Sequence, residues 1–348
     1  MTAYQTGTAS SHVDLWDKLL AFLTTDPTLV AASDQWTTAW LADDSNSGNP
    51  NDTDIVLRGP GSTGTDNIYV GLRREDNVPE DNSTFYVYGM TGVVPNAEQV
   101  TDHINVTPRA VKMFSKTTPM NYWFVASGRR FIVVIKVGTI YQALYAGFFL
   151  AYGTLTQYSY PLFIGAAAGD GGPTEAADWR DVTTKHSLFP FASYSEAATG
   201  WETSAWLLSP QGDWLRCAAD RATANVALGP NYFGTGLGLG ESLVQDADSG
   251  GYGYKSVAAR VVETYGGGFA LAPISLNQFN PADQALGVLD GVYQVTGRGQ
   301  SPENLISVDD RVHVVFSNAF RTAIDSWFAV EVFPENSNSL LVEDSNSP

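Results

Sequence analysis

Histidines are the side chains best suited to acid–base or metal chemistry near neutral pH. The chain has four of them, His12, His103, His186 and His313. None lies in an H-x-x-x-H or H-E-x-x-H pattern, so the spacing indicates no zinc-protease site. Asp181 and Ser187 lie near His186, but no G-x-S-x-G sequence marks a nucleophilic serine, and we expect a polar loop histidine. His313 lies in an alternating segment and is expected to make a structural hydrogen bond.

An acidic loop at Asp246–Gly251 resembles the start of a calcium-binding loop. Its sixth position is glycine, as an EF-hand requires, but the fifth is Gly250 and the twelfth is Val257 in place of a bidentate glutamate. We therefore exclude an EF-hand and expect a solvated acidic turn. An irregular calcium site at this loop, or at Asp309–Asp310, is the alternative interpretation.

Other reactive patterns are incomplete as well. Gly234–Gly240 has glycine at every second position, which differs from the dinucleotide pattern G-x-G-x-x-G, and Glu241 stands where a phosphate-binding loop has lysine. Cys217 is the only cysteine, so an intrachain disulfide and a cysteine metal cluster are excluded. The carboxylates allow a glycosidase pair about 5–9 Å apart, but no spacing points to one. We therefore predict no catalytic residue, no cofactor-binding residue and no metal ligand, and a protein that is not an enzyme.

The clearest helix signal lies over residues 11–25. Ser10 or Ser11 can cap this helix, and Asp26-Pro27 ends it. Apolar residues recur at helical spacing at Val13, Trp16, Leu19, Leu20, Phe22 and Leu23. We expect this apolar face to pack on a sheet or on a neighbouring subunit.

Most other regular segments have the pattern of short strands. The strongest hairpin is Asn121–Val137, in which two apolar runs flank Ser127-Gly128-Arg129, and Gly128 is expected to adopt the positive φ of a tight turn. Residues 206–209 and 214–218 predict a second hairpin. Further strands are expected at 36–41, 54–58, 68–73, 85–90, 147–152, 162–166, 257–264, 291–295, 311–316 and 327–332. The pattern predicts a mainly β protein with β-sandwich or barrel-like domains and a short N-terminal helix.

The small, glycine-rich and acidic segment Ala166–Asp178 is the best candidate for a domain boundary. We predict an N-terminal helical segment at 1–26, a first β domain at 27–166, a second β-rich domain at 167–334 and a C-terminal arm at 335–348. The apolar run Phe131–Ala151 is long enough to span a membrane. However, Lys136, Thr139 and Gln142 interrupt it and β-branched residues favour strand, so we expect buried strands and no membrane span.

The charge balance excludes further classes of protein. The chain has 348 residues, with 19 Lys+Arg against 37 Asp+Glu and a net charge of −18. A nucleic-acid partner is excluded, because phosphate binding needs clustered cations. An apolar content of 44% and an aromatic content of 12% exclude disorder throughout. Charged residues make up only 16%, so neutral polar side chains must cover much of the surface.

Several stretches are similar to one known family of proteins. They are residues 6–19, 57–71, 122–134, 145–150, 160–165, 289–293 and 315–322, with a weaker match at 208–214. Together they resemble a family of tailed-bacteriophage virion proteins that are encoded among tail and baseplate genes. The central hairpin is the most specific element of this resemblance, and the loop at 43–54 is longer than the family pattern.

The resemblance implies a structural role without catalytic residues. It implies a tail or baseplate subunit that assembles with other virion proteins and with copies of itself, in the virion, after synthesis in the host cytoplasm. The N-terminal helix and the C-terminal arm are the segments expected to reach a neighbour. The alternatives are a host-surface glycan-binding adhesin and a neck or capsid decoration protein, and an enzyme acting on glycans comes last.

Overall fold

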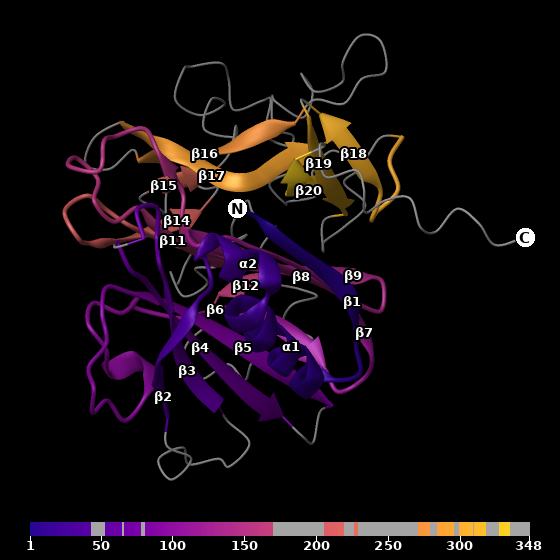
Figure 1. Ribbon diagram of the computed structural model, residues 1–348, viewed down its shortest axis with the longest axis horizontal. Coiled ribbons are helices and arrows are strands. Elements are labelled where there is room, and N and C mark those ends of the chain that lie inside the picture. The colour runs from indigo at the N-terminus through magenta and orange to yellow at the C-terminus, as the bar shows by residue number, and fades with distance from the viewer. Residues whose placement is uncertain are drawn as a thin grey trace, which may run out of the picture.

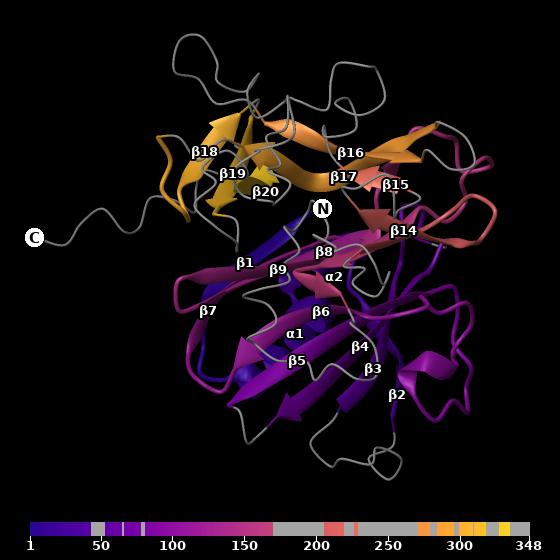
Figure 2. The same ribbon diagram turned by 180° about the vertical axis from the view of Figure 1, so that it is seen from behind.

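The described part of the chain is mainly β, and its strands form three layers (Figures 1 and 2). The computed structural model describes residues 1–42, 53–64, 66–77, 81–169, 205–218, 226–228, 271–278, 284–295, 299–308, 310–317 and 327–334. The predicted fold class is confirmed, because antiparallel sheets pack face to face as in a β-sandwich.

One layer is a six-stranded antiparallel sheet in the order β12-β6-β5-β4-β3-β2. Its strands are β2 (Thr37–Leu41), β3 (Thr53–Gly59), β4 (Ile68–Asn77), β5 (Asn82–Met90), β6 (Val111–Lys116) and β12 (Ala168–Gly169). The 3₁₀ helix η2 (Val100–Asp102) lies in the connection between β5 and β6. This sheet forms the lower layer in Figure 1.

A second, 14-stranded sheet forms the other two layers, because its two halves lie one over the other (Figures 1 and 2). The first half contains β1 (Ala3–Ala9), β7 (Met120–Ala126), β8 (Arg130–Val137), β9 (Ile140–Phe148), β11 (Leu162–Ala166) and β13 (Ala205–Leu208). β14 (Trp214–Ala218) and β15 (Val226–Leu228) form a parallel pair that leads to the second half. That half contains β16 (Ala272–Gln278), β17 (Gln284–Val295), β20 (Trp327–Pro334), β19 (Arg311–Phe316) and β18 (Leu305–Val308), and β10 (Leu150–Ala151) pairs with β17.

The middle layer is buried on both of its faces. Successive residues of a strand point to opposite faces, and in β8 Phe131 and Val133 enter one core while Ile132 and Val134 enter another. The first core lies against the six-stranded sheet and the second against the strands β16 to β20. Burial on both faces explains the continuous apolar run at 131–151, and the expectation of buried strands there is confirmed. None of the helices in the described residues has the length and apolar character needed to cross a bilayer.

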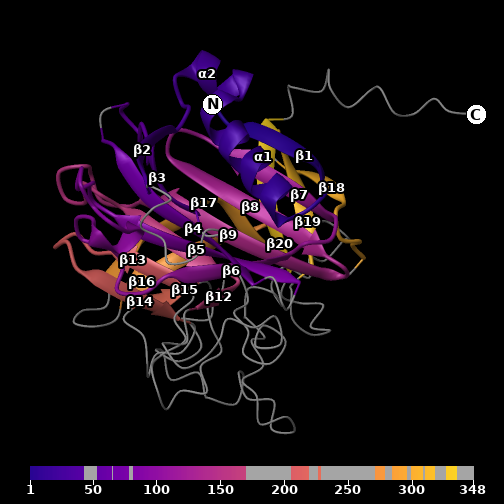
Figure 3. The ribbon, with the colours of Figure 1, turned by 90° about the horizontal axis from the view of Figure 1, so that it is seen from below.

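Two short helices follow β1. α1 (His12–Thr25) is capped by Ser11, whose hydroxyl accepts a hydrogen bond from the Asp14 backbone N–H at 3.2 Å. α2 (Pro27–Ala32) was not predicted, although Asp26 caps it and proline occupies a first-turn position suited to helix entry. α1 lies against β1 and β7 (Figure 3), and its apolar face belongs to the core beside the six-stranded sheet. The expectation that this face packs on a sheet is therefore confirmed.

Several local expectations were wrong. Residues 1–26 are not helical throughout, since Ala3–Ala9 form β1. The strand expected at 147–152 is confirmed only in part: β9 begins earlier, at Ile140, and ends at Phe148, and the separate strand β10 covers Leu150–Ala151. Gly128 does not have a positive φ; a side chain there would instead lie 2.6 Å from Asp34 Oδ1 and 2.8 Å from Pro60 Cγ. Glycine is required at this turn by close packing and not by backbone conformation.

Other expectations concern residues outside the described ranges. These are the strand at 257–264 and the C-terminal arm at 335–348. The division into domains at 27–166 and 167–334 stays a prediction, although the hydrogen-bonded sheet continues from β11 to β13 across that boundary.

Candidate functional site

The most distinctive cluster of charged side chains lies where β8 faces the upper layer. Arg130 and Lys136 stand near the two ends of β8, on the same face as Ile132 and Val134. Each cation pairs with a carboxylate from the last third of the chain, Arg130 with Asp290 and Lys136 with Glu303. We call Arg130, Lys136, Tyr141, Asp290 and Glu303 the polar seam.

Arg130 is the buried end of the seam. Its side chain is only 3% exposed, and its Nε lies 3.4 Å from Asp290 Oδ2. The next residue, Gly291, has a φ of +72°, and a Cβ there would lie 2.2 Å from Arg130 Nη2. The backbone of β17 therefore passes directly over the guanidinium, and only glycine leaves room for it. Because Asp290 carries the only charge that pairs with Arg130 among the described residues, this contact holds the layers in one register.

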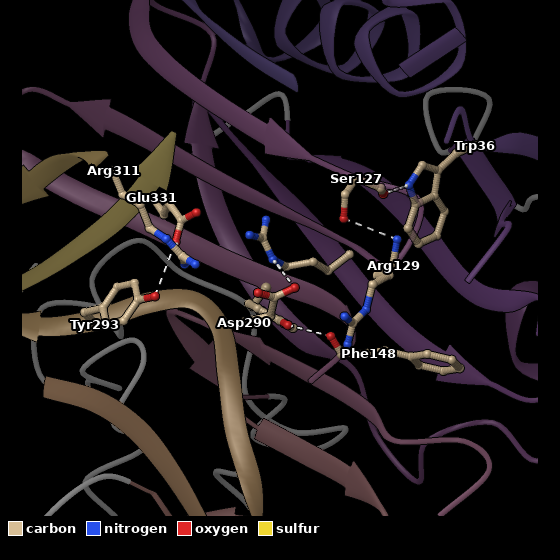
Figure 4. Close-up of polar contacts among 10 residues, drawn as sticks. Trp36, Ser127, Arg129, Phe148, Asp290, Tyr293, Arg311 and Glu331 are labelled. Atoms are coloured by element: carbon tan, nitrogen blue, oxygen red, sulfur yellow. Dashed lines mark hydrogen bonds and ion pairs between the residues drawn. The ribbon is translucent and has the colours of Figure 1, made fainter. Parts of the chain in front are cut away.

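Three hydrogen bonds, donated by Trp36, Arg129 and Phe148, fix the turn before Arg130 (Figure 4). The Trp36 indole N–H donates to the Ser127 carbonyl at 2.9 Å, and the Arg129 N–H donates to Ser127 Oγ at 3.3 Å. The Phe148 N–H donates to the Arg129 carbonyl at 2.8 Å. Gly147 has a φ of +136°, and a Cβ there would lie 2.4 Å from that same carbonyl oxygen. These contacts fix the backbone next to Arg130, whose side chain faces the upper layer.

Lys136 forms the more exposed end of the seam. Its Nζ lies 2.5 Å from Glu303 Oε1, and the Tyr141 hydroxyl donates to the same oxygen at 2.5 Å. Burial, the largest effect, raises the pKa of Tyr141, so this hydroxyl keeps the proton that it donates. Glu303 has a φ of 72°, a left-handed conformation that is unusual for glutamate. The pairing with Lys136 and Tyr141 compensates for this strain.

The Glu303 carboxylate is expected to make the fold sensitive to acid. Partial burial would raise the pKa of Glu303, but the hydrogen bonds from Lys136 and Tyr141 and the lysine charge together lower it below its ordinary value of 4.5. A carboxylate whose pKa is lowered by folding stabilises the fold above its unfolded pKa, and that contribution is lost as the pH falls through the folded pKa.

We therefore expect Glu303→Gln to lower the free energy of unfolding by less than about 1 kcal/mol at pH 7, because the pair is about one-third exposed. The substitution should also reduce the further loss of stability between about pH 5 and about pH 3. Urea unfolding at several pH values measures both effects. Asp310→Asn, in an exposed turn, is the control, and an unchanged acid slope in Glu303→Gln would contradict the assignment.

A second polar cluster lies within the upper layer (Figure 4). Arg311 Nη1 donates to Glu331 Oε2 at 2.9 Å, and the Tyr293 hydroxyl donates to the same oxygen at 3.3 Å. The His313 ring packs edge-on against Tyr293, with centroids 5.2 Å apart, and is 1% exposed. Burial, the largest effect, lowers the pKa of His313, so its imidazole is neutral at pH 7. The cluster joins β17, β19 and β20.

The remaining described histidines have structural contacts. His12 Nε2 lies 3.2 Å from Asp76 Oδ1, and His103 Nδ1 accepts a hydrogen bond from the Val94 N–H at 3.1 Å. Burial, the largest effect, raises the pKa of Cys217, which therefore remains a thiol. Within the described residues, no three His, Cys, Asp or Glu side chains are grouped closely enough to hold a metal ion.

Several motifs singled out in the sequence lie outside the described residues. They are His186 with Asp181 and Ser187, the loop Asp246–Gly251, the segment Gly234–Gly240 and Asp309. Asp310 lies in the turn before β19 with a φ of 60°.

Sequence reasoning missed the polar seam. The available signal was a pair of cations six residues apart on one face of a strand that is otherwise apolar. Their acidic partners could not be identified, since Asp290 is 160 residues from Arg130 and many carboxylates compete for the pairing. The geometry couples two layers through ion pairs and a hydrogen bond. No protein-family model matches the chain, and neither does any curated protein.

Proposed function

We propose that the chain is a non-enzymatic structural subunit of a bacteriophage tail or baseplate, which assembles with copies of itself and with other virion proteins around the tail. The observation that supports this proposal is the position of the family-like stretches in the fold. The most specific stretch, residues 122–134, forms β7 and the start of β8 at the centre of the middle layer. The others contribute to β1, α1, β4, β9, β11, β17 and β19. The resemblance thus follows the framework that packs the layers.

The aromatic side chains provide further support. Among the aromatic residues whose side-chain burial the structure describes, Tyr152, at 65% exposure, is the only exposed one, and the others are buried or half-buried. A glycan-binding surface usually offers exposed aromatic rings for stacking, whereas a structural subunit buries them in cores and interfaces. The adhesin alternative therefore has less support than an assembly role. Binding on a glycan array that is lost in Tyr152→Ala would favour the adhesin instead.

Protein mass spectrometry of purified virions tests the assembly role. We expect the chain to copurify with intact particles in a fixed multiple-copy ratio to the major tail proteins and to resist a high-salt wash. A chain that is abundant in infected-cell lysate but absent from washed particles would overturn the proposal.

The net charge of −18 predicts that salt stabilises the isolated subunit. Like charges repel in the compact state, and raising NaCl from about 0.1 M to about 1 M shortens the Debye length from about 10 Å to about 3 Å. We expect the melting temperature to rise by about 1–2 °C, which corresponds to about 1 kcal/mol for a chain of this length. Differential scanning calorimetry in NaCl measures the shift, and a melting temperature that falls with salt would contradict the expectation.

A further inference from the structure

Among the described strands, β1 is the longest of those that end the two sheets. The terminal strands are β1 and β18 in the 14-stranded sheet and β2 and β12 in the other. β12 has two residues, β18 has four, and β2 is irregular between Thr38 and Trp40. β1 has seven residues and pairs with β7 without interruption. Natural edge strands are usually short, bulged, charged or interrupted by proline, and β1 has none of these features.

Side-chain hydrogen bonds also hold β1 against β7. Thr6 Oγ1 donates to the Tyr122 carbonyl at 2.9 Å, and Thr8 Oγ1 donates to Asn121 Oδ1 at 3.0 Å. These contacts fix β1 in strand geometry while the Thr6 and Thr8 side chains remain exposed. Among the described strands, β1 pairs only with β7. The backbone groups of an edge strand that point away from its neighbour are available to another strand.

A second copy can meet β1 without local charge repulsion. Two chains of net charge −18 repel each other, so contact between them is best made through a neutral strip. Residues 1–13 contain no Asp, Glu, Lys or Arg, and all of β1 lies within them. A strand that meets its own copy around a two-fold axis also needs an antiparallel register in which every facing pair is compatible.

We propose that β1 pairs antiparallel with β1 of a second copy, about a two-fold axis that passes beside Thr6. This register uses all seven residues, and Thr6 then faces Thr6 of the other copy. Tyr4 faces Thr8, Gln5 faces Gly7, and Ala3 faces Ala9. Threonine pairs and aromatic–threonine pairs stabilise antiparallel sheets, and no like charges oppose each other. The 14-stranded sheets of the two copies would join into one.

The inference deepens the proposed function and rests on it for the expectation that copies of the chain meet. A seven-residue edge buries less than the roughly 1,200–2,000 Å² of a stable interface, so the isolated dimer should be weak and reinforced by neighbours in an assembly. The test must therefore detect a weak, defined pairing.

Cysteine cross-linking of the full chain tests the register. Paired residues of antiparallel strands have Cα atoms about 4.5–5.5 Å apart, which suits a disulfide. The native Cys217 is buried, so background linkage is low. Under mild oxidation, Thr6→Cys is expected to form a covalent dimer in most chains, whereas Thr8→Cys, which faces Tyr4, should link far less. Thr37→Cys on the exposed edge of β2 is the control.

A charge test complements the cross-linking. Thr6→Lys and Thr6→Glu should each weaken self-association in sedimentation velocity at least about tenfold, and a one-to-one mixture should restore it. Circular dichroism checks that each variant folds. The proposal is overturned if Thr6→Cys stays monomeric, if Thr37→Cys links equally well, or if the mixture associates no better than either variant alone. A chain that fails these tests but is found in the tail refutes only the β1 pairing, whereas a dimer of a chain absent from virions refutes only the proposed function.

Discussion

Replacing Trp36 with alanine is expected to lower the free energy of unfolding by about 3–5 kcal/mol, the range for removing a buried tryptophan. Trp36 is fully buried, and its ring packs edge-on against Phe131 with centroids 5.1 Å apart. A Cβ added at Gly59 would lie 2.9 Å from the Trp36 ring, so the ring fills its space completely. The indole N–H also holds the Ser127 carbonyl in the turn before Arg130. The variant therefore loses packing and a hydrogen bond at once.

Urea unfolding followed by circular dichroism measures this loss. Trp36→Phe keeps most of the volume but leaves the Ser127 carbonyl without its indole donor, and should cost about 1–3 kcal/mol. Tyr152→Ala, an exposed aromatic residue, is the control and should change stability by less than about 0.5 kcal/mol. A cost below about 1 kcal/mol for Trp36→Ala would show that the turn does not depend on this side chain.

The second large effect is expected from Asp290→Asn. This change leaves the Arg130 guanidinium buried without its counter-charge, and breaking a buried ion pair on one side costs about 3–5 kcal/mol. Because the Asp290 side chain is 24% exposed, we expect a value near the lower end, about 3 kcal/mol. Combining it with Arg130→Met removes both charges and should restore part of the stability, since a buried pair can often be replaced by apolar side chains.

The complete double-mutant cycle separates the pairing of Asp290 with Arg130 from the effect of each side chain alone. Arg311→Ala supplies the comparison, because Arg311 is 55% exposed and its pair with Glu331 should contribute less than about 1 kcal/mol. If Asp290→Asn costs no more than Arg311→Ala, or if the double variant is the least stable of all, the polar seam does not hold the layers as described.

The sequence predicted a helix and a hairpin whose signals lie within one short segment of the chain. The helix α1 and the hairpin of β7 and β8 were predicted because their apolar residues follow a regular period and turn or cap residues bound them. β1 was missed since residues 4–9 include Gln5, two threonines and Gly7 and have no aliphatic run. Its strand conformation depends on pairing with β7, more than 100 positions away. Such non-local pairing leaves little trace in a short window of sequence.

The reasons behind local features were harder to predict than the features themselves. Gly128 was correctly placed in a turn, but it is required because Asp34 and Pro60 approach it, which a one-dimensional pattern does not contain. The polar seam was missed for the same reason, since Arg130 and Asp290 meet only after the sheet has folded over itself. Contacts between layers could be identified only from the tertiary fold.

The position of the subunit in an averaged electron cryo-microscopy map of purified virions tests the central claim most directly. A structural tail or baseplate subunit predicts several copies of the three-layered fold around the tail tube or in the baseplate, with the chain traceable in the density. Density for this fold only at the outermost fibre tips, only on the capsid or neck, or nowhere in the particle would contradict that assignment.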